Sequence, residues 1–298
     1  MTRFRPLAGA LAALLAAGLL AACGSDDGSD TGTAASTQAA TSTPATTAAD
    51  ACTKDQLQTR SAGTLTVGTD KPPYPPYFEN DDPTNGKGFE SAVAYAIADQ
   101  LGFSKDEVKW TVVPFNSSYA PGNKDFDFDV NQISITPKRA ERVDFSDPYY
   151  TAPQAVVALK DAVAANATDL ASLKDAQLGV QIGTTSLDAV DATIQPSEQP
   201  KVFNDSNDTV AAVKQGQVDA IVVDLPTALY LTAAEIPKAK VVGQFDAPGG
   251  DTWGAVLAKD SPLTDCVNQA IGELKSSGEL DQLTQKWMSQ SAGAPELR

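Results

Sequence analysis

The sequence predicts an α/β fold, because short β-branched segments alternate with segments of helical periodicity. The segment 64–69, TLTVGT, has the character of a strand. In the segment 88–102 that follows, large apolar residues recur four positions apart from Phe89 to Leu101, which predicts a helix with one apolar face. In such sheets ligands bind beyond the carboxyl ends of the strands, so we expect the functional residues just after the strands.

The same alternation continues to the end of the chain. The part that can fold has roughly 240 residues, which fits one large domain or two lobes. The further elements are expected, in order, as strands at 108–115 and 128–136, a strand, turn and helix over 176–190, a helix at 206–217, a strand at 218–224, and a strand followed by two helices over 253–287.

The N-terminal residues predict an exported protein anchored to a membrane. Arg3 and Arg5 precede an apolar run that is too short to span a bilayer, the layout of a secretory signal over residues 1–22. The run ends in LAAC, which resembles a bacterial lipobox, so we expect lipidation at Cys23; the alternative is an ordinary signal peptide with a chance cysteine. Residues 23–51 contain no aromatic residue and predict a flexible tether.

Composition excludes several functional classes. The chain has 22 Lys and Arg against 38 Asp and Glu, a formal net charge of −16, which argues against nucleic acid or anionic lipid as a partner. It has no histidine, which removes most Ser/His and Cys/His catalytic arrangements and the usual zinc sites. The acidic segments DDPTN and DFDFD lack the ligand spacing of an EF-hand loop. We therefore expect no metal and no cofactor.

Two cysteines remain besides the one expected to carry lipid. An even pair in an exported domain favours a disulfide between Cys52 and Cys266, and two buried thiols are the alternative. The bridge would close most of the folded chain into one loop. In the chain-entropy account this contributes on the order of 4–5 kcal/mol to stability, less any strain.

Six motifs occur in the order found in the amino-acid-binding proteins of ABC importers, solute-binding protein family 3. They are LTVGTDKPPYPPYFE, GKGFESAVAYAIADQLG, SITPKRAERVDFSDPYY, GVQIGTTSL, GQVDAIVVD and KSSGELDQLTQKW. The chain resembles that family from about residue 63 to residue 290, nearly the whole folded part.

The resemblance implies a periplasmic-binding-protein-like fold of two α/β lobes, with the ligand cleft between them. Two crossover strands would join the lobes near residues 153–160 and 249–256. The implied division is lobe one at 52–153 plus 249–290, lobe two at 154–248, and a C-terminal tail at 291–298. Both Cys52 and Cys266 would then belong to lobe one.

The resemblance also implies how an amino acid is held. Arg139 matches the arginine whose planar guanidinium binds the ligand carboxylate, a geometry that lysine cannot reproduce. Asp224, which closes VDAIVVD, matches the acid that pairs with the α-ammonium group. Helix N–H groups near Thr184 and Thr185 would add affinity for an anion. The implied ligand-binding set is Asp70, Tyr74, Phe115, Gln132, Ser134, Arg139, Thr184, Thr185 and Asp224.

Several of these assignments have alternatives. Tyr74 and Phe115 match aromatics that enclose the ligand side chain, but DKPPYPPY carries an extra proline, so Tyr77 is the alternative to Tyr74. Asp70 matches a position that contacts the ligand side chain, and an acid there favours a polar or cationic ligand. Gln132 matches a backbone-contact position.

The charged residues have structural alternatives as well. Arg139 would otherwise be a surface residue paired with Glu141 or Asp144. Asp224 would otherwise cap the helix expected directly after it. Glu90 replaces the commoner aspartate of its motif, and we expect it to have a structural role.

The function that follows is transport. The predicted protein is a monomeric lipoprotein at the outer face of the cytoplasmic membrane, which captures a free amino acid and delivers it to an ABC permease without catalysis. One alternative is an exported dehydratase-like enzyme on the same fold, which would need a carboxylate or lysine as its acid–base group. Another is a sensory ligand-binding protein, which normally carries a transmembrane helix and a signalling domain.

Overall fold

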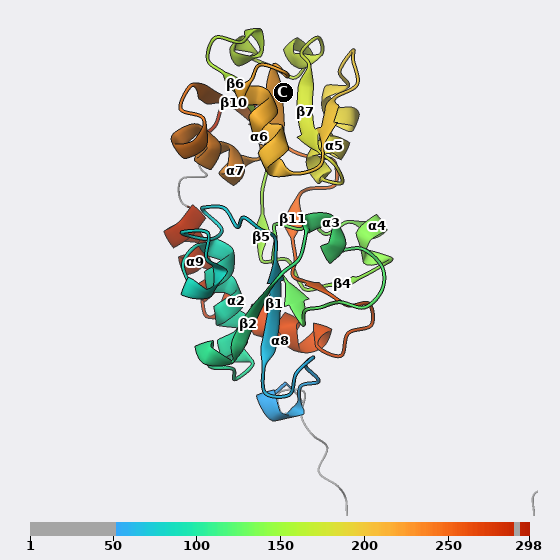
Figure 1. Ribbon diagram of the computed structural model, residues 1–298, viewed down its shortest axis with the longest axis vertical. Helices are drawn as coiled ribbons and strands as arrows, with labels where there is room; N and C mark the ends of the chain where they lie inside the picture. The colour runs from blue at the N-terminus through green and yellow to red at the C-terminus, as the bar shows by residue number, and fades with distance from the viewer. Residues whose placement is uncertain (1–51, 289–292) are drawn as a thin grey trace, which may run out of the picture. The chain divides into compact units, whose positions relative to one another are not determined.

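The computed structural model describes residues 52–288 and 293–298 (Figure 1). The predicted signal at 1–22, the predicted lipidation of Cys23 and the predicted tether lie outside the described residues. In the described part of the chain, no helix is both long enough and apolar enough to cross a membrane.

The first sheet has five strands in the order β2-β1-β3-β12-β4. Strand β1 is parallel to β2 and β3, whereas β12 runs antiparallel to β3 and β4. We call the part built on this sheet lobe one. Its strands are β1 (Leu65–Thr69), β2 (Val108–Val112), β3 (Phe128–Asp129), β4 (Asp144–Phe145) and β12 (Val256–Leu257); its longer helices are α2 (Phe89–Gln100), α8 (Thr264–Ser276) and α9 (Glu279–Met288), and its short ones η1 (Lys54–Gln56), η2 (Pro83–Asn85), η3 (Lys105–Glu107), α3 (Phe115–Ser118) and α4 (Pro137–Ala140).

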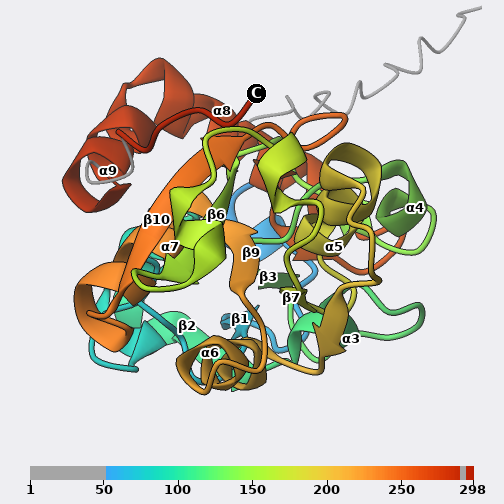
Figure 2. The same ribbon diagram turned by 90° about the horizontal axis from the view of Figure 1, so that it is seen from above.

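The second sheet has five strands in the order β10-β6-β9-β7-β8, and Figure 2 labels β10, β6, β9 and β7 in this order. Strand β7 is parallel to β8 and β9, and β6 is antiparallel to β9 and β10. We call this part lobe two. Its strands are β6 (Gln154–Leu159), β7 (Leu178–Gln181), β8 (Lys201–Phe203), β9 (Ala220–Asp224) and β10 (Ala239–Phe245); its helices are η4 (Val163–Asn166), η5 (Ala171–Leu173), α5 (Thr185–Ala189), η6 (Val190–Ile194), α6 (Ser206–Lys214), α7 (Leu225–Tyr230) and η7 (Leu231–Glu235).

Two segments connect the sheets and pair with each other. Strand β5 (Tyr150–Thr151) leads into β6, and β11 (Thr252–Trp253) leads back into lobe one toward β12. The two are antiparallel, with Trp253 opposite Tyr150. The Trp253 ring is fully buried and packs on Tyr150, with ring centroids 4.9 Å apart. The chain therefore crosses between the lobes through two adjacent strands.

The predicted helix face is confirmed in α2. Phe89, Val93 and Ile97 are fully buried and join the main apolar core of lobe one, together with residues of α8 and α9. Strand β6 is buried along nearly its whole length, which suits a strand covered on both faces.

Two predicted strands are shorter than expected. The strand expected over 128–136 ends at Asp129, because Gln132 adopts a left-handed conformation with φ 50° that an extended strand cannot contain. Strand β2 ends at Val112, and the chain turns into α3 after Pro114. Both changes move side chains from a strand into loops at the carboxyl end of the sheet.

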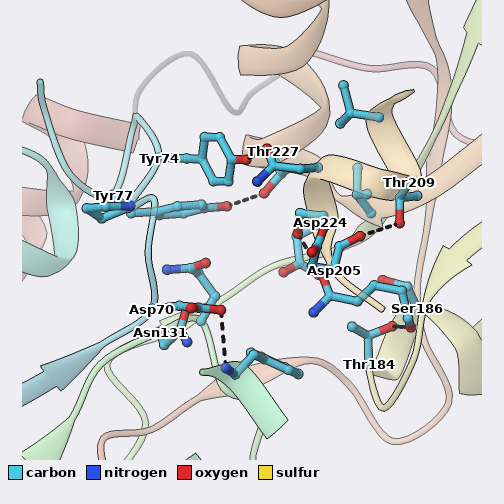
Figure 3. Close-up of a pocket in the computed structure, with 18 of the residues that line it drawn as sticks. Asp70, Tyr74, Tyr77, Asn131, Thr184, Ser186, Asp205, Thr209, Asp224 and Thr227 are labelled. Atoms are coloured by element: carbon cyan, nitrogen blue, oxygen red, sulfur yellow. Dashed lines mark hydrogen bonds between the residues drawn. The ribbon is translucent and has the colours of Figure 1, made fainter. Parts of the chain in front are cut away.

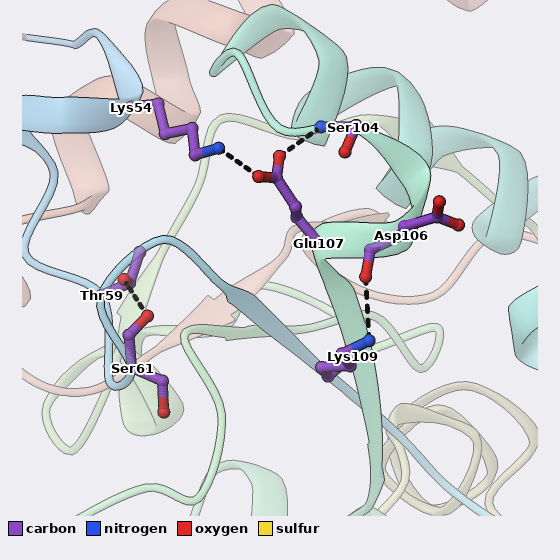
Figure 4. A network of polar contacts seen from close by, with 7 residues as sticks. All are labelled: Lys54, Thr59, Ser61, Ser104, Asp106, Glu107 and Lys109. Carbon is purple, nitrogen blue, oxygen red and sulfur yellow. Dashed lines mark hydrogen bonds and ion pairs between the residues drawn. The ribbon is translucent and has the colours of Figure 1, made fainter.

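The predicted disulfide between Cys52 and Cys266 is present in the structure, with Cα atoms 5.2 Å apart. It ties the start of the described chain to helix α8. Figure 4 shows a second attachment nearby, in which Lys54 pairs with Glu107, and Glu107 accepts a hydrogen bond from the Ser104 N–H group. The N-terminal turn of lobe one is thereby fixed to the segment that enters β2.

The segment 293–298, expected as a tail, pairs with strand β10 of lobe two. The Gln244 N–H group donates to Pro295 O over 2.7 Å, and the Leu297 N–H group donates to Gln244 O over 2.8 Å. Leu297 is 3% exposed and belongs to an apolar core of lobe two. A side chain at Gly243 would collide with Leu297, since a Cβ there would lie 2.6 Å from Leu297 Cγ. The segment is thus packed into lobe two, whereas α9, the helix that precedes it in the chain, belongs to lobe one.

Candidate functional site

A cavity of about 130 Å³ lies where the carboxyl ends of strands from both sheets meet. Since one water needs roughly 10–15 Å³ of such space, the cavity can admit a small organic molecule. Lobe one contributes the loops after β1, β2 and β3, and lobe two contributes the start of α5, the start of α6 and the β9–α7 junction. Figure 3 shows Asp70, Asn131 and the two tyrosines on one side, and Asp224 and Asp205 on the other.

Aromatic residues form much of the wall, and the structure places the predicted Tyr74, Phe115 and the alternative Tyr77 all on the cavity, together with Phe78 and Tyr230. The Tyr77 hydroxyl lies 2.8 Å from Thr227 Oγ1 of lobe two (Figure 3). The Tyr77 ring is 2% exposed and meets Trp253 edge-on, so it also belongs to the core. Tyr74 bonds to Asn207 of lobe two and is less enclosed. Tyr74 and Tyr77 therefore both line the cavity, and Tyr77 does not take the place of Tyr74.

Asp70 connects two of the loops of lobe one. Its Oδ1 atom accepts from the Lys71 N–H group over 2.7 Å, and its Oδ2 atom accepts from the Phe115 N–H group over 3.2 Å (Figure 3). These bonds fix the carboxylate at the edge of the cavity, where it can attract a cationic group.

Arg139 lies behind the cavity wall and is 7% exposed. The Thr136 side chain caps the short helix α4 at the Arg139 N–H group, and Pro137 begins the helix, which together set the direction of the Arg139 side chain. Its Nη1 atom donates to Ser134 O over 2.7 Å, and its Nη2 atom donates to Gly183 O of lobe two over 2.9 Å. The guanidinium carbon lies 4.5 Å from the centre of the Tyr119 ring.

The burial of Arg139 has an electrostatic consequence. Burial lowers the pKa of the guanidinium, which Tyr119 and Asp251 partly offset. Among the described residues Arg139 makes no ion pair, and Asp144 pairs with Lys259 instead. The alternative of a surface arginine paired with Glu141 or Asp144 is therefore wrong.

The predicted hydroxyl residues meet across the cleft. Ser134 Oγ of lobe one lies 3.2 Å from Thr185 Oγ1 of lobe two, and both side chains line the cavity. Thr184 caps α5, accepting from the Leu187 N–H group over 3.3 Å. Gln132 also lines the cavity, but its backbone N–H group and side-chain amide both donate to Glu90.

Glu90 is a buried structural acid, as expected from the sequence. It accepts hydrogen bonds from the Gln132 N–H group and from the Tyr149 hydroxyl, over 2.7 and 2.5 Å. Burial raises the pKa of Glu90 to about 7, against the opposing effect of these hydrogen bonds. Its hydrogen bonds with Gln132, which has a left-handed backbone, attach the loop after β3 to the start of α2.

Asp224 lies at the end of β9 and lines the cavity. It stands at the N-cap position of α7, but its side chain makes no capping hydrogen bond. Its Oδ1 atom instead accepts from Gln154 Nε2 over 2.7 Å. Asp224 therefore occupies the N-cap position without capping the helix through its side chain. Its carboxylate is directed to the cleft (Figure 3).

Several polar residues of this region were not predicted. Asn131 lines the cavity, and its Nδ2 atom is buried without a hydrogen-bond partner among the described residues. Gln154 and Asp251 bond to each other beside Asp224. Their positions on the crossover segments PQAVVALK and GGDTWGAV were the only available signal, because the pairing depends on how the two segments lie together.

No group of three or more His, Cys, Asp or Glu side chains in the described ranges is arranged to hold a metal ion. The lining acids Asp70, Asp205 and Asp224 are spread over both lobes, and Lys71 is the lining cation. The arrangement suits an organic molecule that carries positive charge.

Two α/β lobes, two paired crossover strands and a cleft at the strand ends, lined by aromatic rings and acidic groups, define a two-lobed binding protein. The chain belongs to the bacterial extracellular solute-binding proteins, family 3, whose profile matches residues 65–290. This confirms the resemblance found in the sequence motifs.

Individual relatives agree with this assignment. The arginine-binding extracellular protein of Bacillus subtilis is 29% identical over 246 residues, covering 81% of this chain and 93% of that protein. The L-cystine-binding protein of Escherichia coli K12 is 30% identical over 237 residues, covering 77% and 84%. An ancestral arginine-binding protein bound to arginine superposes with a TM-score of 0.62 at 32% identity, covering 76% of this chain and 98% of that one. These relatives are binding proteins, in agreement with the expectation that the chain is not an enzyme.

Proposed function

We propose that the protein captures a cationic or polar amino acid between its lobes and delivers it to an ABC permease. The observation that carries this proposal is the charge of the cavity, which is lined by Asp70, Asp205 and Asp224 but by a single lysine. A ligand with a net positive charge is attracted to such a site. The relatives named for binding arginine support the same ligand class.

In this proposal the amino acid is held by its two common groups. Arg139 binds the ligand carboxylate. Ser134 of lobe one and Thr184 and Thr185 of lobe two contribute further hydrogen bonds to it. Its bonds to Ser134 O and Gly183 O use two of the five N–H groups of a guanidinium and hold the fork in a fixed orientation. Asp224 pairs with the α-ammonium group. Contacts from both lobes would make ligand binding favour the closed cleft.

The remaining lining residues would contact the ligand side chain. Tyr74, Tyr77 and Phe115 enclose it, and Asp70 pairs with a positive charge at its end. A buried tyrosine or phenylalanine ring supplies apolar area, and its face also attracts a cation. Gln132 shapes this part of the wall through its backbone.

The cellular setting is also part of the proposal. Lipid on Cys23 and the tether 23–51 would hold a monomer at the outer face of the cytoplasmic membrane. The lobes would comprise residues 52–153 with 249–290, and residues 154–248. Delivery to a permease then needs no diffusion away from the membrane.

A double comparison by calorimetry tests the assignment of Arg139. A thermal-shift screen of the twenty amino acids, cystine and small polyamines first identifies the ligand. Arg139→Ala should then weaken binding by about 30-fold to several thousand-fold, since loss of one partner of a buried charge pair costs roughly 2–5 kcal/mol. Amidation of the ligand carboxylate should harm the parent strongly and Arg139→Ala much less.

The neighbouring arginine of the same motif provides the control. Arg142 is exposed, so Arg142→Ala should bind like the parent. If the losses from Arg139→Ala and from ligand amidation simply add, Arg139 does not hold the carboxylate.

A further inference from the structure

Two polar side chains on the crossover segments are buried without a role in the binding just described. Gln154 begins β6 on one segment, and Asp251 precedes β11 on the other. They are 0% and 2% exposed. Gln154 Nε2 donates to Asp224 Oδ1 over 2.7 Å and to Asp251 Oδ2 over 2.5 Å. One amide group therefore holds two carboxyl groups close together beside the cavity.

The surroundings supply little positive charge for this pair. Among the described residues neither Asp224 nor Asp251 makes an ion pair. The cation that acts on both is Arg139, but its guanidinium donates to two backbone carbonyls. Glu90 adds a further carboxyl group near Asp224, and Tyr77 faces Asp224 with a phenol whose pKa burial raises well above its ordinary value. Two carboxylates that share such a site cannot both ionise easily.

The hydrogen bonds of Asp251 are compatible with a bound proton. Its Oδ2 atom accepts from Gln154 Nε2 and, over 3.0 Å, from Thr185 Oγ1. Its Oδ1 atom is buried and has no hydrogen-bond partner in the described part of the chain. A buried carboxylate oxygen without a donor is costly, whereas a proton on that oxygen removes the charge and leaves both bonds to Oδ2 intact.

The titration behaviour of the pair agrees with this geometry. Burial raises the pKa of Asp224 well above its ordinary value, and the Asp251 carboxyl group raises it further. Burial also raises the pKa of Asp251, and the nearby polar side chains of Ser134, Thr185 and Gln154 lower it in part.

We propose that Asp224 and Asp251 together hold one proton in the empty cleft and release it when the ligand ammonium group binds at Asp224. The inference rests on the proposed function, because it takes Asp224 as the partner of the ammonium group. The O–H bond of the pair breaks and its proton passes to solvent, so the incoming positive charge replaces the one that leaves. Asp251 does not line the cavity. It is a positioning residue, which acts through their shared partner Gln154 on the charge of Asp224.

This coupling gives binding a defined dependence on pH. If one proton is released, affinity rises with pH by up to about tenfold per pH unit while the pair is protonated, and it levels off once the pair has lost its proton. A ligand without an ammonium group gains nothing from this exchange.

Calorimetry with L-arginine in buffers of different ionisation enthalpy measures the released protons directly. The parent should release about one proton per arginine bound below the pH at which the pair loses its proton. Asp251→Asn keeps an oxygen acceptor for Gln154 and Thr185 but removes the second carboxyl group that raises the pKa of Asp224, so proton release and the pH dependence of arginine affinity should both be confined to lower pH than in the parent. Asp246→Asn, at an exposed acid earlier in the same loop, should match the parent. Release that is unchanged in Asp251→Asn overturns the inference and leaves the proposed function standing.

A measurement on the ligand-free protein distinguishes failure of this inference from failure of the proposed function. Infrared difference spectra of parent against Asp251→Asn at neutral pH should contain the band of a protonated carboxyl group, and Asp224→Asn should remove the same band if Asp251→Asn does not fold. Absence of that band overturns the inference whatever the ligand. If no amino acid binds although the band is present, the proposed function fails, and ligand-linked release fails with it.

Discussion

The carboxyl group of Asp129 fills the space that a side chain at Gly68 would need. The two residues are paired on the adjacent strands β3 and β1, and a Cβ at Gly68 would lie 2.4 Å from Asp129 Oδ2. Asp129 is fully buried, and neither of its carboxyl oxygens has a hydrogen-bond partner in normal geometry within the described ranges. A glycine near the carboxyl end of β1 thus makes room for an acid in the interior of lobe one.

Asp129→Asn is expected to flatten the dependence of stability on pH. Burial raises the pKa of Asp129 from its ordinary 3.8 to about 8, against smaller effects of Ser118 and Lys124. The folded protein keeps a proton that the unfolded chain releases, so the free energy of unfolding falls as pH rises between these two values. Asparagine has the same shape and no charge. In the variant, the fall of the unfolding free energy with pH should be smaller by up to about 1.4 kcal/mol per pH unit. Urea unfolding at a series of pH values measures the slope.

The control is Asp125→Asn, which changes an exposed acid four residues earlier. Glu90, whose pKa is about 7, contributes a slope of the same sign to the parent and to both variants. If the Asp129→Asn profile runs parallel to that of the parent, the buried carboxyl group is not the source of the slope.

Gly88→Ala should destabilise the protein strongly. Gly88 precedes α2 with φ 95°, and a Cβ there would lie 2.4 Å from Tyr77 O and 2.5 Å from Phe78 Cα. Both contacts are to backbone, which cannot move aside without displacing the Tyr77 loop. The matched variant is Gly122→Ala, since Gly122 also has positive φ, 105°, but open space around its Cα. That variant should lose only the roughly 1–3 kcal/mol of backbone strain. Equal losses in urea unfolding would show that the close approach at Gly88 does not matter.

Loss of the Cys52–Cys266 bridge should lower stability without weakening ligand binding. The double variant Cys52→Ser with Cys266→Ser is expected to lose about 2–5 kcal/mol of unfolding free energy, as is usual when a native disulfide is removed. Neither cysteine lines the cavity, so affinity at a temperature where the variant is folded should match the parent. Non-reducing peptide mapping of the exported parent should recover the cross-link. Free thiols at both positions, or a variant as stable as the parent, would contradict this expectation.

Cys23→Ser tests the proposed lipid anchor. Without the thiol the chain cannot be lipidated, so the variant should appear in the soluble fraction or accumulate unprocessed. Fractionation of cells that express parent and variant, followed by mass measurement of the N-terminal peptide, separates these outcomes. A variant that stays on the membrane with normal processing would show that Cys23 is not the anchor.

Sequence patterns predicted features that depend on local spacing or on composition. The apolar face from Phe89 to Leu101 follows from helical spacing, and the Cys52–Cys266 pair follows from the two cysteines that remain in an exported domain. The strand over 128–136 was too long, because the chain turns at Gln132, whose left-handed backbone donates a hydrogen bond to Glu90, 42 positions away.

Contacts between the lobes were beyond sequence patterns. The bonds from Arg139 to Gly183 O and from Gln154 to Asp251 join residues 44 and 97 positions apart. Such pairs depend on the angle at which two folded units meet, which local spacing does not encode. The motifs could place Arg139 and Asp224 at strand ends, but they could not reveal the second acid beside Asp224.

The docking of segment 293–298 on strand β10 gives the two lobes a third covalent connection. Met288 is packed in the core of lobe one, and Leu297 is packed in a core of lobe two. Five peptide links separate Met288 from Gly293, and a fully extended chain of that length reaches at most about 18 Å. As long as both ends stay packed, the polypeptide acts as a leash of fixed length. While both ends stay packed, the length of the intervening chain limits how far Met288 and Gly293 can move apart.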